Sequence, residues 1–568
     1  MSSSSFLSFD RVRKAIIGRN FTFQTPYGDR LLTYADYTAS GRSLEFIEQF
    51  LIKIQREYAN THTEDDITGR HMTNLLHHAE HLIKKALNAE NNCSVIAVGT
   101  GATGAISKLQ EILGVKIHPA TKKLALTLVP EIDALIPRFN ERKPVVFIGP
   151  YEHHSNDIMW REALVEVVTV NITPEGYFDI KDLEMKVSNP KFKNRIIIGT
   201  FSAASNVTGI KSPIYEIARI MHKYNGIACF DYAASAPYVK IDMNKDSDSY
   251  IDAIYLSPHK CIGGPGSSGI LVFNNNLYDS NLTPTCAGGG TVDYVSPKAV
   301  DYIDDIETRE KAGTPGILQT IKAALAIDLK AAIGISNIEE KELDYISRAL
   351  ERLQKNKNIE ILGPVDPQNR ISIVSFMIKH DDKYIHPKLT TNLLNDLFGI
   401  QSRAGCMCAG SYGHLLLKID EETSLKFRKL IAQNIIGIKP GWCRVNFHYL
   451  HSELEFQFIC DAIEFIANYG KKFLSEYIFN YQTGEWNHNK FNNRQEEPLT
   501  NIKNILEMEL HYCFEEQLIN RDLIFDRYLK EAKKIVSSLE VPSNFGVFKN
   551  PEAETLRWFN FVHIDNEI

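Results

Sequence analysis

The chain has 568 residues, 44% of them hydrophobic and 23% charged, and its formal net charge is −7. This composition is typical of a soluble globular protein, and the lack of a basic tract argues against a nucleic-acid or membrane-surface role. No apolar run approaches the roughly 18 residues that span a bilayer. The N-terminal sequence lacks a sustained apolar region, so we expect a cytosolic protein. Nine irregularly spaced cysteines predict free thiols and no disulfide framework.

The first half of the chain is expected to alternate strands with helices. After a strand-like segment in LLTYADYTASGR, the pattern is mostly helical over 43–87, with a polar interruption at 60–63. Strands are then predicted at 95–98, 145–148, 165–170, 195–200, 227–230, 253–256 and 270–273. Amphipathic helices are predicted after the glycine-rich turn at 99–104 and after Ser212 and Pro213. This alternation predicts a mainly parallel sheet, covered on both faces, with its site at the carboxyl ends of the strands.

The second half of the chain is predicted to contain a smaller α/β unit and a tail of different character. A helical region from about residue 317 leads to a strand at 371–378, a helix near 389–398 and a loop that holds Cys406 and Cys408. We therefore expect four segments, which are an N-terminal lead-in over 1–45, a large domain over 46–316, a small α/β domain over 317–473 and a C-terminal extension over 474–568.

The extension combines helical stretches with polar loops and carries several aromatic residues, namely Tyr477, Tyr481, Trp486, Trp558 and Phe559. Their apolar surface is large enough to dock the extension on the rest of the chain. Two interpretations stay open for its role. The extension is either a stabilising appendage or a cover over an interface between subunits or over the entrance of the site.

Lys260 is the main candidate for chemistry because of its setting at a predicted strand end. It follows Ser257 and His259 in the segment S-P-H-K and precedes a glycine-rich stretch. A hydroxyl, an imidazole and flexible backbone around an amine suit a lysine that must meet a phosphorylated cofactor. Asp231 ends a neighbouring predicted strand, so the carboxylate and the amine are both expected at the carboxyl edge of the sheet.

Eight separated segments together resemble the pyridoxal-phosphate (PLP) enzymes of the class V aminotransferase group, closest to cysteine desulfurases and selenocysteine lyases. The segments are V-G-T-G-A-T-G-A-I, Y-E-H-H-S-N-D, S-N-V-T-G, F-D-Y-A-A-S-A-P, S-P-H-K, R-E-K-A-G-T-P, S-R-A-G-C-M-C-A and W-C-R-V-N-F. The resemblance covers roughly residues 30–470. It implies the α/β fold of PLP-dependent transferases of fold type I, with a mainly parallel central sheet in a large domain and a smaller α/β domain. In this chain a helical C-terminal extension would follow.

The resemblance assigns three residues to the reactive part of PLP. Lys260 matches the lysine that holds the cofactor as an imine, through which the ring absorbs electrons from the substrate α-carbon. Asp231 matches the carboxylate that keeps the pyridine nitrogen protonated. His153 matches the imidazole that stacks on the ring and moves protons. The adjacent His153 and His154 also suggest a metal site, but no nearby Cys/His spacing completes one, so no metal is expected.

Other matched residues are implied to hold the remainder of the cofactor. Asn206 matches the asparagine that contacts the ring oxygen. Thr314 matches a threonine that reaches the phosphate of the neighbouring subunit, which implies a homodimer with shared sites. The glycine-rich turn opens a helix, whose N-terminal N–H groups can hold a phosphate. The phosphate contacts implied by the resemblance are Ala102, Thr103, Ser257 and His259.

The segment around Cys408 indicates which reaction to expect. Cys408 matches the cysteine of the mobile desulfurase loop, whose thiolate attacks the sulfur of a cysteine-like substrate to leave a persulfide and alanine. Arg444 matches the arginine that grips the substrate carboxylate, and Arg403 is the second expected substrate-binding residue. An amino acid is therefore the expected substrate, with a sulfur-acceptor protein as a further partner and neither nucleic acid nor membrane.

Three positions depart from the family pattern and leave alternatives open. Ala234 stands where desulfurases usually carry a glutamine that bonds the ring oxygen, and Met407 and Cys406 stand where polar residues are common. The two thiols can relay sulfur or trap it. The alternative reactions are C–S cleavage on a bulkier substrate, epimerisation or transamination, with Cys408 as a small buried hydrophobe. A further alternative is a PLP-fold protein that acts mainly as a scaffold.

Overall fold

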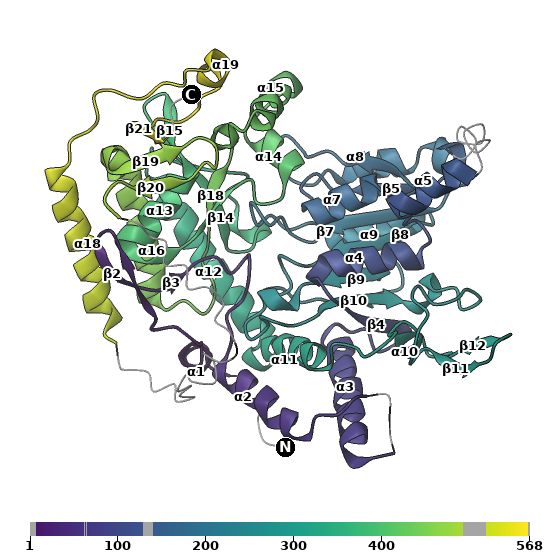
Figure 1. Cartoon of the computed structure of the whole chain (residues 1–568). Coiled ribbons are helices and arrows are strands. Elements are labelled where there is room, and N and C mark those ends of the chain that lie inside the picture. Colours follow the sequence, from purple (N-terminus) through teal and green to yellow (C-terminus); the bar gives the residue numbers. More distant parts are fainter. Residues whose placement is uncertain are drawn as a thin grey trace.

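The computed structural model describes residues 7–61, 63, 65–128, 140–491, 502 and 519–565. Figure 1 shows a sheet-based large domain on one side, and on the other a small domain against which the C-terminal elements lie. Within the described ranges, no helix combines the length and the apolar character needed to cross a bilayer. The same ranges contain no group of three or more His, Cys, Asp or Glu side chains arranged to hold a metal ion.

A seven-stranded sheet forms the centre of the large domain, in the order β4-β10-β9-β8-β7-β5-β6. Its strands are β4 (Cys93–Val98), β5 (Val145–Ile148), β6 (Glu166–Thr169), β7 (Ile197–Ser202), β8 (Ile227–Asp231), β9 (Ala253–Leu256) and β10 (Gly269–Asn274). Strand β10 runs antiparallel to both of its neighbours, β4 and β9, whereas β9, β8, β7, β5 and β6 pair with one another in parallel. The predicted mainly parallel sheet is confirmed, and each predicted strand lies within two residues of an observed one.

Two helical layers cover this sheet because successive side chains of a strand point to opposite faces. On one face, α4 (Gly101–Ile112) and α7 (His154–Arg161) pack against residues such as Tyr255. On the other face, Ile254 packs in a core that the remaining helices complete. These helices are α3 (Ile67–Ala86), α8 (Ile180–Val187), α9 (Ile214–Lys223) and α11 (Ile317–Ile333).

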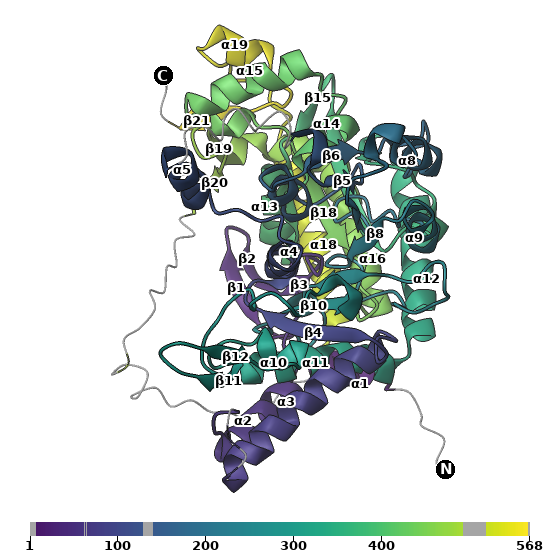
Figure 2. The ribbon, with the colours of Figure 1, turned by 90° about the vertical axis from the view of Figure 1, so that its right-hand side faces the viewer.

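Shorter elements surround the large domain. Figure 2 shows α2 and α3 at one end of the molecule, near the β11–β12 hairpin. The N-terminal and peripheral elements are α1 (Phe9–Lys14), β1 (Thr22–Thr25), β2 (Gly28–Leu31), α2 (Glu45–Ile54), α5 (Pro119–Leu128), β11 (Val292–Val295), β12 (Val300–Tyr302) and α10 (Ile306–Arg309).

The small domain is built on an antiparallel sheet in the order β13-β14-β18-β17, with β15 paired to β14. The strands are β13 (Ile359–Ile361), β14 (Ile373–His380), β15 (Lys383–Ile385), β17 (Arg403–Gly405) and β18 (Trp442–Asn446). The helices of this part are α12 (Ile335–Gln354), α13 (Pro387–Phe398), α14 (Gly410–Leu416), α15 (Glu421–Ala432) and α16 (Glu453–Tyr469). Strand β3 (Thr33–Tyr34) pairs in parallel with β16 (Ile400–Gln401), so the N-terminal segment joins this domain.

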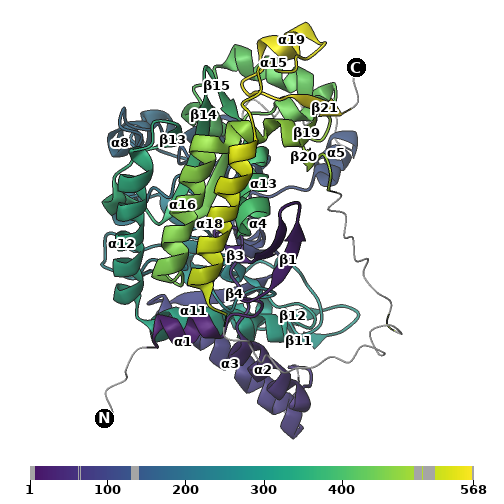
Figure 3. The same ribbon diagram turned by 90° about the vertical axis from the view of Figure 1, so that its left-hand side faces the viewer.

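The C-terminal extension shares one hydrophobic core with the small domain. Its elements are β19 (Tyr477–Asn480), β20 (Trp486–His488), α18 (Arg521–Ser538), α19 (Pro551–Thr555) and β21 (His563–Asp565), so a three-stranded sheet accompanies the expected helices. Figure 3 shows α18 alongside α16. There Phe525 stacks on Phe458 with ring centroids 3.9 Å apart. The predicted docking through aromatic side chains is confirmed, and its place is the outer side of the small domain.

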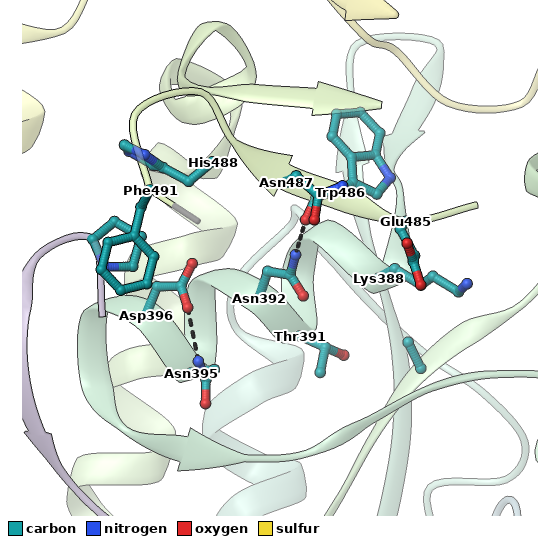
Figure 4. Close-up of a pocket in the computed structure, with 12 residues that line it drawn as sticks. Lys388, Thr391, Asn392, Asn395, Asp396, Glu485, Trp486, Asn487, His488 and Phe491 are labelled. Atoms are coloured by element: carbon teal, nitrogen blue, oxygen red, sulfur yellow. Dashed lines mark hydrogen bonds between the residues drawn. The ribbon is translucent and has the colours of Figure 1, made fainter. Parts of the chain in front are cut away.

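Polar contacts add to this junction. Between α13 and β20 lies a groove of about 400 Å³ whose walls are joined by hydrogen bonds (Figure 4). Across the groove, the Asn392 side chain donates to the carbonyl of Trp486 (2.5 Å), whereas within α13 Asn395 donates to Asp396 (2.7 Å). The hydroxyl of Tyr477 donates to the other oxygen of Asp396 (2.7 Å). Because these polar groups form hydrogen bonds with one another, we interpret the groove as a polar contact between the extension and the small domain.

The buried carboxylate of Glu152 fixes the turn between β5 and α7. One oxygen accepts from the N–H groups of Gly149 (3.1 Å) and Ser202 (2.8 Å). The other accepts from the Ser202 hydroxyl (2.6 Å) and the Asn156 amide (2.7 Å). The turn is thereby bonded to the end of β7. Burial raises the pKa of Glu152 from 4.5 to about 7.

We expect Phe525→Ala to lower the free energy of unfolding by about 3 kcal/mol, because it removes a buried ring from a packed stack. Urea titration followed by fluorescence measures this loss. Leu523→Ala, at a side chain on the same helix that is 66% exposed, should change it by less than about 0.5 kcal/mol. Equal effects of the two variants would show that α18 does not share the core of the small domain.

Glu152→Gln should remove a pH dependence of stability. A carboxyl group whose folded pKa exceeds its unfolded value binds a proton more tightly in the fold. Its contribution is therefore complete below pH 4.5 and declines, by about 1.4 kcal/mol per pH unit, as the pH rises to about 7. Urea titrations across this range should show that the slope in the variant differs from that in the parent by about this amount. An unchanged slope contradicts the assignment, and Glu162→Gln, at the exposed end of α7, is the control.

Candidate active site

A cavity of about 190 Å³ opens at the carboxyl ends of the parallel strands. It brings together eight of the predicted residues, which are Ala102, Thr103, His153, Asn206, Asp231, Ser257, His259 and Lys260. Six residues that the sequence analysis did not select as site residues complete its lining, namely Thr100, Ser155, Ser202, Ala204, Ala233 and Ala234. The convergence follows from the sheet, because parallel strands end at one edge and their following turns meet there.

The N-terminus of α4 forms an anion cradle on one wall of the cavity. Gly101 has a φ of +58°, and a Cβ at this position would lie 2.8 Å from the Ser257 hydroxyl, so the close approach requires glycine. The N–H of Ala102 donates to that hydroxyl (2.9 Å), and the hydroxyl of Thr103 lies 2.7 Å from that of Ser155. Hydroxyl groups and helix N–H groups at a positive helix end suit a phosphate.

Lys260 lines the same cavity from a short turn after β9, η3 (Pro258–Lys260). Burial lowers the pKa of its amine, Arg444 and Arg403 lower it further, and the Asp231 carboxylate opposes this shift. An amine with a lowered pKa has more of the neutral, nucleophilic form at physiological pH. The lowered pKa increases the share of neutral amine at Lys260.

Asp231 and the two histidines frame the remainder of the cavity. Asp231 ends β8, is 4% exposed, and accepts from the N–H of Ala233 (2.8 Å). Burial raises its pKa, while that hydrogen bond and Lys260 favour the anion. His153 caps α7, where its Nδ1 accepts from the N–H of Ser155 (3.2 Å). Burial and the nearby Lys260 lower the pKa of His153 and of His259 to about 4, so both rings are neutral at pH 7.

Asn206 offers an unused acceptor at the cavity wall. Its amide nitrogen donates to the carbonyl of Met407 (2.7 Å). Its side-chain oxygen is buried and has no hydrogen-bond partner within the described part of the chain. A buried acceptor without a partner costs free energy unless a ligand supplies a donor. Asn206 therefore fits a hydroxyl group of a bound molecule.

Arg444 and Arg403 are joined by a carboxylate that the sequence analysis missed. The two arginines face each other across β17 and β18. Asp36 accepts from Arg444 (2.9 Å) through one oxygen and from Arg403 (3.0 Å) through the other. Arg444 is 3% exposed and also donates to the carbonyl of Asn206 (2.8 Å). Asp36 lies in the strand-like segment near the N-terminus. No sequence pattern around it predicts that it contacts the arginines of the small domain.

The loop with Cys408 lies between β17 and α14, beside α7. Cys408 is exposed and Cys406 is partly buried, and both are free thiols. Met407 and Cys408 have φ values of +52° and +56°, and the Met407 side chain is buried. Cys408 is not among the described residues that line the cavity. The structure thus places the predicted nucleophile next to the cavity-forming helix and outside the cavity itself.

Thr314 lies apart from this cavity. It is exposed, and its hydroxyl accepts from the side chain of Asn60 (3.2 Å). Its expected contact belongs to a neighbouring subunit, so this role stays a prediction. Ala234, which stands where the resemblance implies a glutamine, lines the cavity and brings no hydrogen-bonding side chain there.

Solved structures share this fold. The apo cysteine desulfurase from Thermococcus onnurineus NA1 superposes with a TM-score of 0.63 at 20% identity, over 82% of this chain and all of that one. The cysteine desulfurase CsdA from Escherichia coli gives a TM-score of 0.60 at 18% identity, over 81% of this chain and 98% of that one. These values establish the expected fold type I architecture.

The amino-acid sequence is also similar to curated relatives and matches a family profile. A probable cysteine desulfurase of Halalkalibacterium halodurans is 32% identical over 268 residues, which are 46% of this chain and 61% of that protein. One of Mycobacterium leprae is 28% identical over 47% of this chain and 60% of its own, so these two matches span about three fifths of each relative. One of Streptomyces coelicolor is 23% identical over 77% of this chain and 93% of its own. The profile of the aminotransferase class-V family matches residues 33–451, and the chain therefore belongs to this enzyme family.

Proposed function

We propose that this protein is a PLP-dependent enzyme of the cysteine desulfurase type. It would remove sulfur, or selenium, from cysteine or a related thio-amino acid and release alanine. The observation that carries the proposal is the single cavity in which Lys260, Asp231 and His153 face an anion cradle, with the Cys408 loop attached to the helix that His153 caps. The relatives named as probable cysteine desulfurases support it.

The cavity residues fit PLP by two independent features. The glycine-dependent cradle at α4 suits the phosphate, and the unpartnered oxygen of Asn206 suits the ring hydroxyl. Asp231 would pair with the ring nitrogen and His153 would cover the ring face, while Ala102, Thr103, Ser257 and His259 would hold the phosphate. When bound, PLP supplies an electron sink that makes the substrate α-proton acidic.

The reaction then depends on three side chains of this chain. The Nζ of Lys260 takes the proton from the substrate α-carbon, because its lowered pKa makes the free amine available. The Sγ thiolate of Cys408 attacks the substrate sulfur, the bond between that sulfur and the substrate β-carbon breaks, and the carbon fragment keeps the electron pair and leaves as alanine after protonation. A persulfide remains on Cys408. Arg444 binds the substrate carboxylate, with Arg403 beside it. Because Asp36 already pairs with both arginines, the substrate must share Arg444 with this carboxylate, and the unpartnered Nε of Arg444 is available for it.

The proposal extends to assembly and partners. A homodimer would bring Thr314 of each subunit to the phosphate of the other, consistent with its exposed position. The exposed Cys408 suits transfer of the persulfide sulfur to an acceptor protein. The cytosol, expected from composition, is the proposed compartment.

A second candidate keeps the cofactor and changes the reaction. Cys408 lies outside the cavity lining, as it would if the chain catalysed C–S cleavage on a bulkier substrate, epimerisation or transamination without a cysteine nucleophile. A scaffold without chemistry would not need the lowered pKa of Lys260 or the anion cradle. Two experiments separate these cases.

Lys260→Ala should abolish the visible absorbance of PLP bound to the purified protein, since no other cavity residue offers an amine. Spectra before and after addition of PLP measure this. Lys298→Ala, at an exposed site on the β11–β12 hairpin, should keep the absorbance. A parent protein that takes up no PLP would favour the scaffold.

Cys408→Ala should stop the release of alanine and sulfide from cysteine while PLP absorbance persists, because only the sulfur acceptor is lost. The parent should form both products in equal amounts. Cys406→Ala, two residues away on the same loop, is the matched comparison and should retain at least half of the turnover. Unchanged turnover in Cys408→Ala would contradict the persulfide step, and loss in Cys406→Ala alone would transfer the role to Cys406.

A further inference from the structure

His154 bonds the Cys408 loop at two points. Its backbone N–H donates to the carbonyl of Cys408 (2.8 Å). Its ring nitrogen Nε2 accepts from the N–H of Gly410 (3.0 Å), the first residue of α14. A Cβ at Gly410 would lie 3.1 Å from this nitrogen, so the ring is pressed against the backbone. The residue next to the cavity histidine therefore holds the backbone at Cys408 and two residues after it.

Further contacts along α7 reinforce the same junction. The carboxylate of Asp157 accepts from the hydroxyl of Ser411 (3.2 Å), and Arg161 donates to that hydroxyl (3.2 Å). On the cavity side, Asn206 donates to the carbonyl of Met407. The loop is thus attached to α7 and to the cavity wall by its backbone. None of these contacts uses the exposed thiol of Cys408.

We propose that His154 is a positioning residue, which holds the Cys408 loop on α7 and so sets the distance between the thiol and the cavity. This inference rests on the proposed function for its catalytic consequence, whereas the contact itself is independent of it. The adjacent residues His153 and His154 therefore have different roles. His153 faces the cavity, and His154 turns outward to the loop that brings the nucleophile.

The contact requires a neutral ring, because a protonated Nε2 is a donor and cannot accept from Gly410. Burial lowers the pKa of His154, and Lys439 and Arg161 lower it further, while Asp157 opposes them. His153 is the other titratable neighbour, with ring centroids 6.3 Å apart. A histidine whose folded pKa lies below 6.5 keeps its neutral contact above that pH and loses it as the pH falls through the lowered folded value.

Hydrogen–deuterium exchange of the holoenzyme tests the contact directly. In His154→Leu, which removes the acceptor, amides of residues 406–411 should exchange roughly fivefold to tenfold faster than in the parent at pH 7, after correction for intrinsic rates. In His154→Gln, whose side-chain oxygen can replace Nε2, the rates should stay within about twofold of the parent. The parent should lose protection as the pH falls through the lowered folded pKa of His154, and His154→Gln should not, because the amide does not titrate.

Kinetics with cysteine test the catalytic consequence. His154→Leu should lower kcat for sulfur release about fivefold to tenfold with KM and PLP absorbance unchanged, and His154→Gln should restore it. His78→Leu makes the same substitution at an exposed position on α3, and as the control it should leave kcat unchanged. Equal exchange in His154→Leu and the parent, or a folded His154→Gln that exchanges like His154→Leu, would overturn the inference. If the parent releases no sulfur from cysteine, the proposed function fails while the exchange rates still decide the contact.

Discussion

The parallel alignment of β5, β7, β8 and β9 is the constraint on which the site depends. Since these strands point the same way, the turns that follow them meet at one edge and deliver His153, Ser202, Asp231 and Lys260 into a single cavity. The Glu152 carboxylate then bonds two of these turns to each other. The antiparallel β10 lets the sheet continue to β4, whose end opens the glycine turn of α4.

Electrostatic balance at this edge favours an anionic ligand. Lys260 lies near Arg444 and Arg403, which lower its pKa, and near Asp231 and Asp36, which raise it. Asp36 pairs with both arginines, so both guanidinium groups are held in place without a substrate. A carboxylate and a phosphate would complete a site that already contains a prepared amine. The neutral His153 and His259 avoid adding repulsion to this cluster.

The two domains meet through α7 and the small-domain sheet. Strands β17 and β18 present the arginines, and the chain after β17 forms the Cys408 loop that His154 holds. The C-terminal extension does not border this cavity among the described residues, but packs on the other side of α13 and α16. Its core contacts, such as Phe525 on Phe458, stabilise the domain that carries β17 and β18. Whether the extension also covers an interface between subunits stays a prediction.

The sequence by itself determined the strands of the large sheet, the glycine turn of α4 and the positions of Lys260 and Asp231. These features have short-range causes, namely β-branched runs, glycine at a close approach and polar residues directly after strands. Tertiary structure alone decided the pairing of Asp36 with Arg444, 408 residues apart, and the contact of His154 with Gly410, 256 residues apart. Such contacts depend on how β3 joins β16 and how α7 meets α14, and no local periodicity encodes the crossing of one domain to another. For the same reason the sequence could name Cys408 as a candidate but could not place it outside the cavity, where the loop geometry holds it.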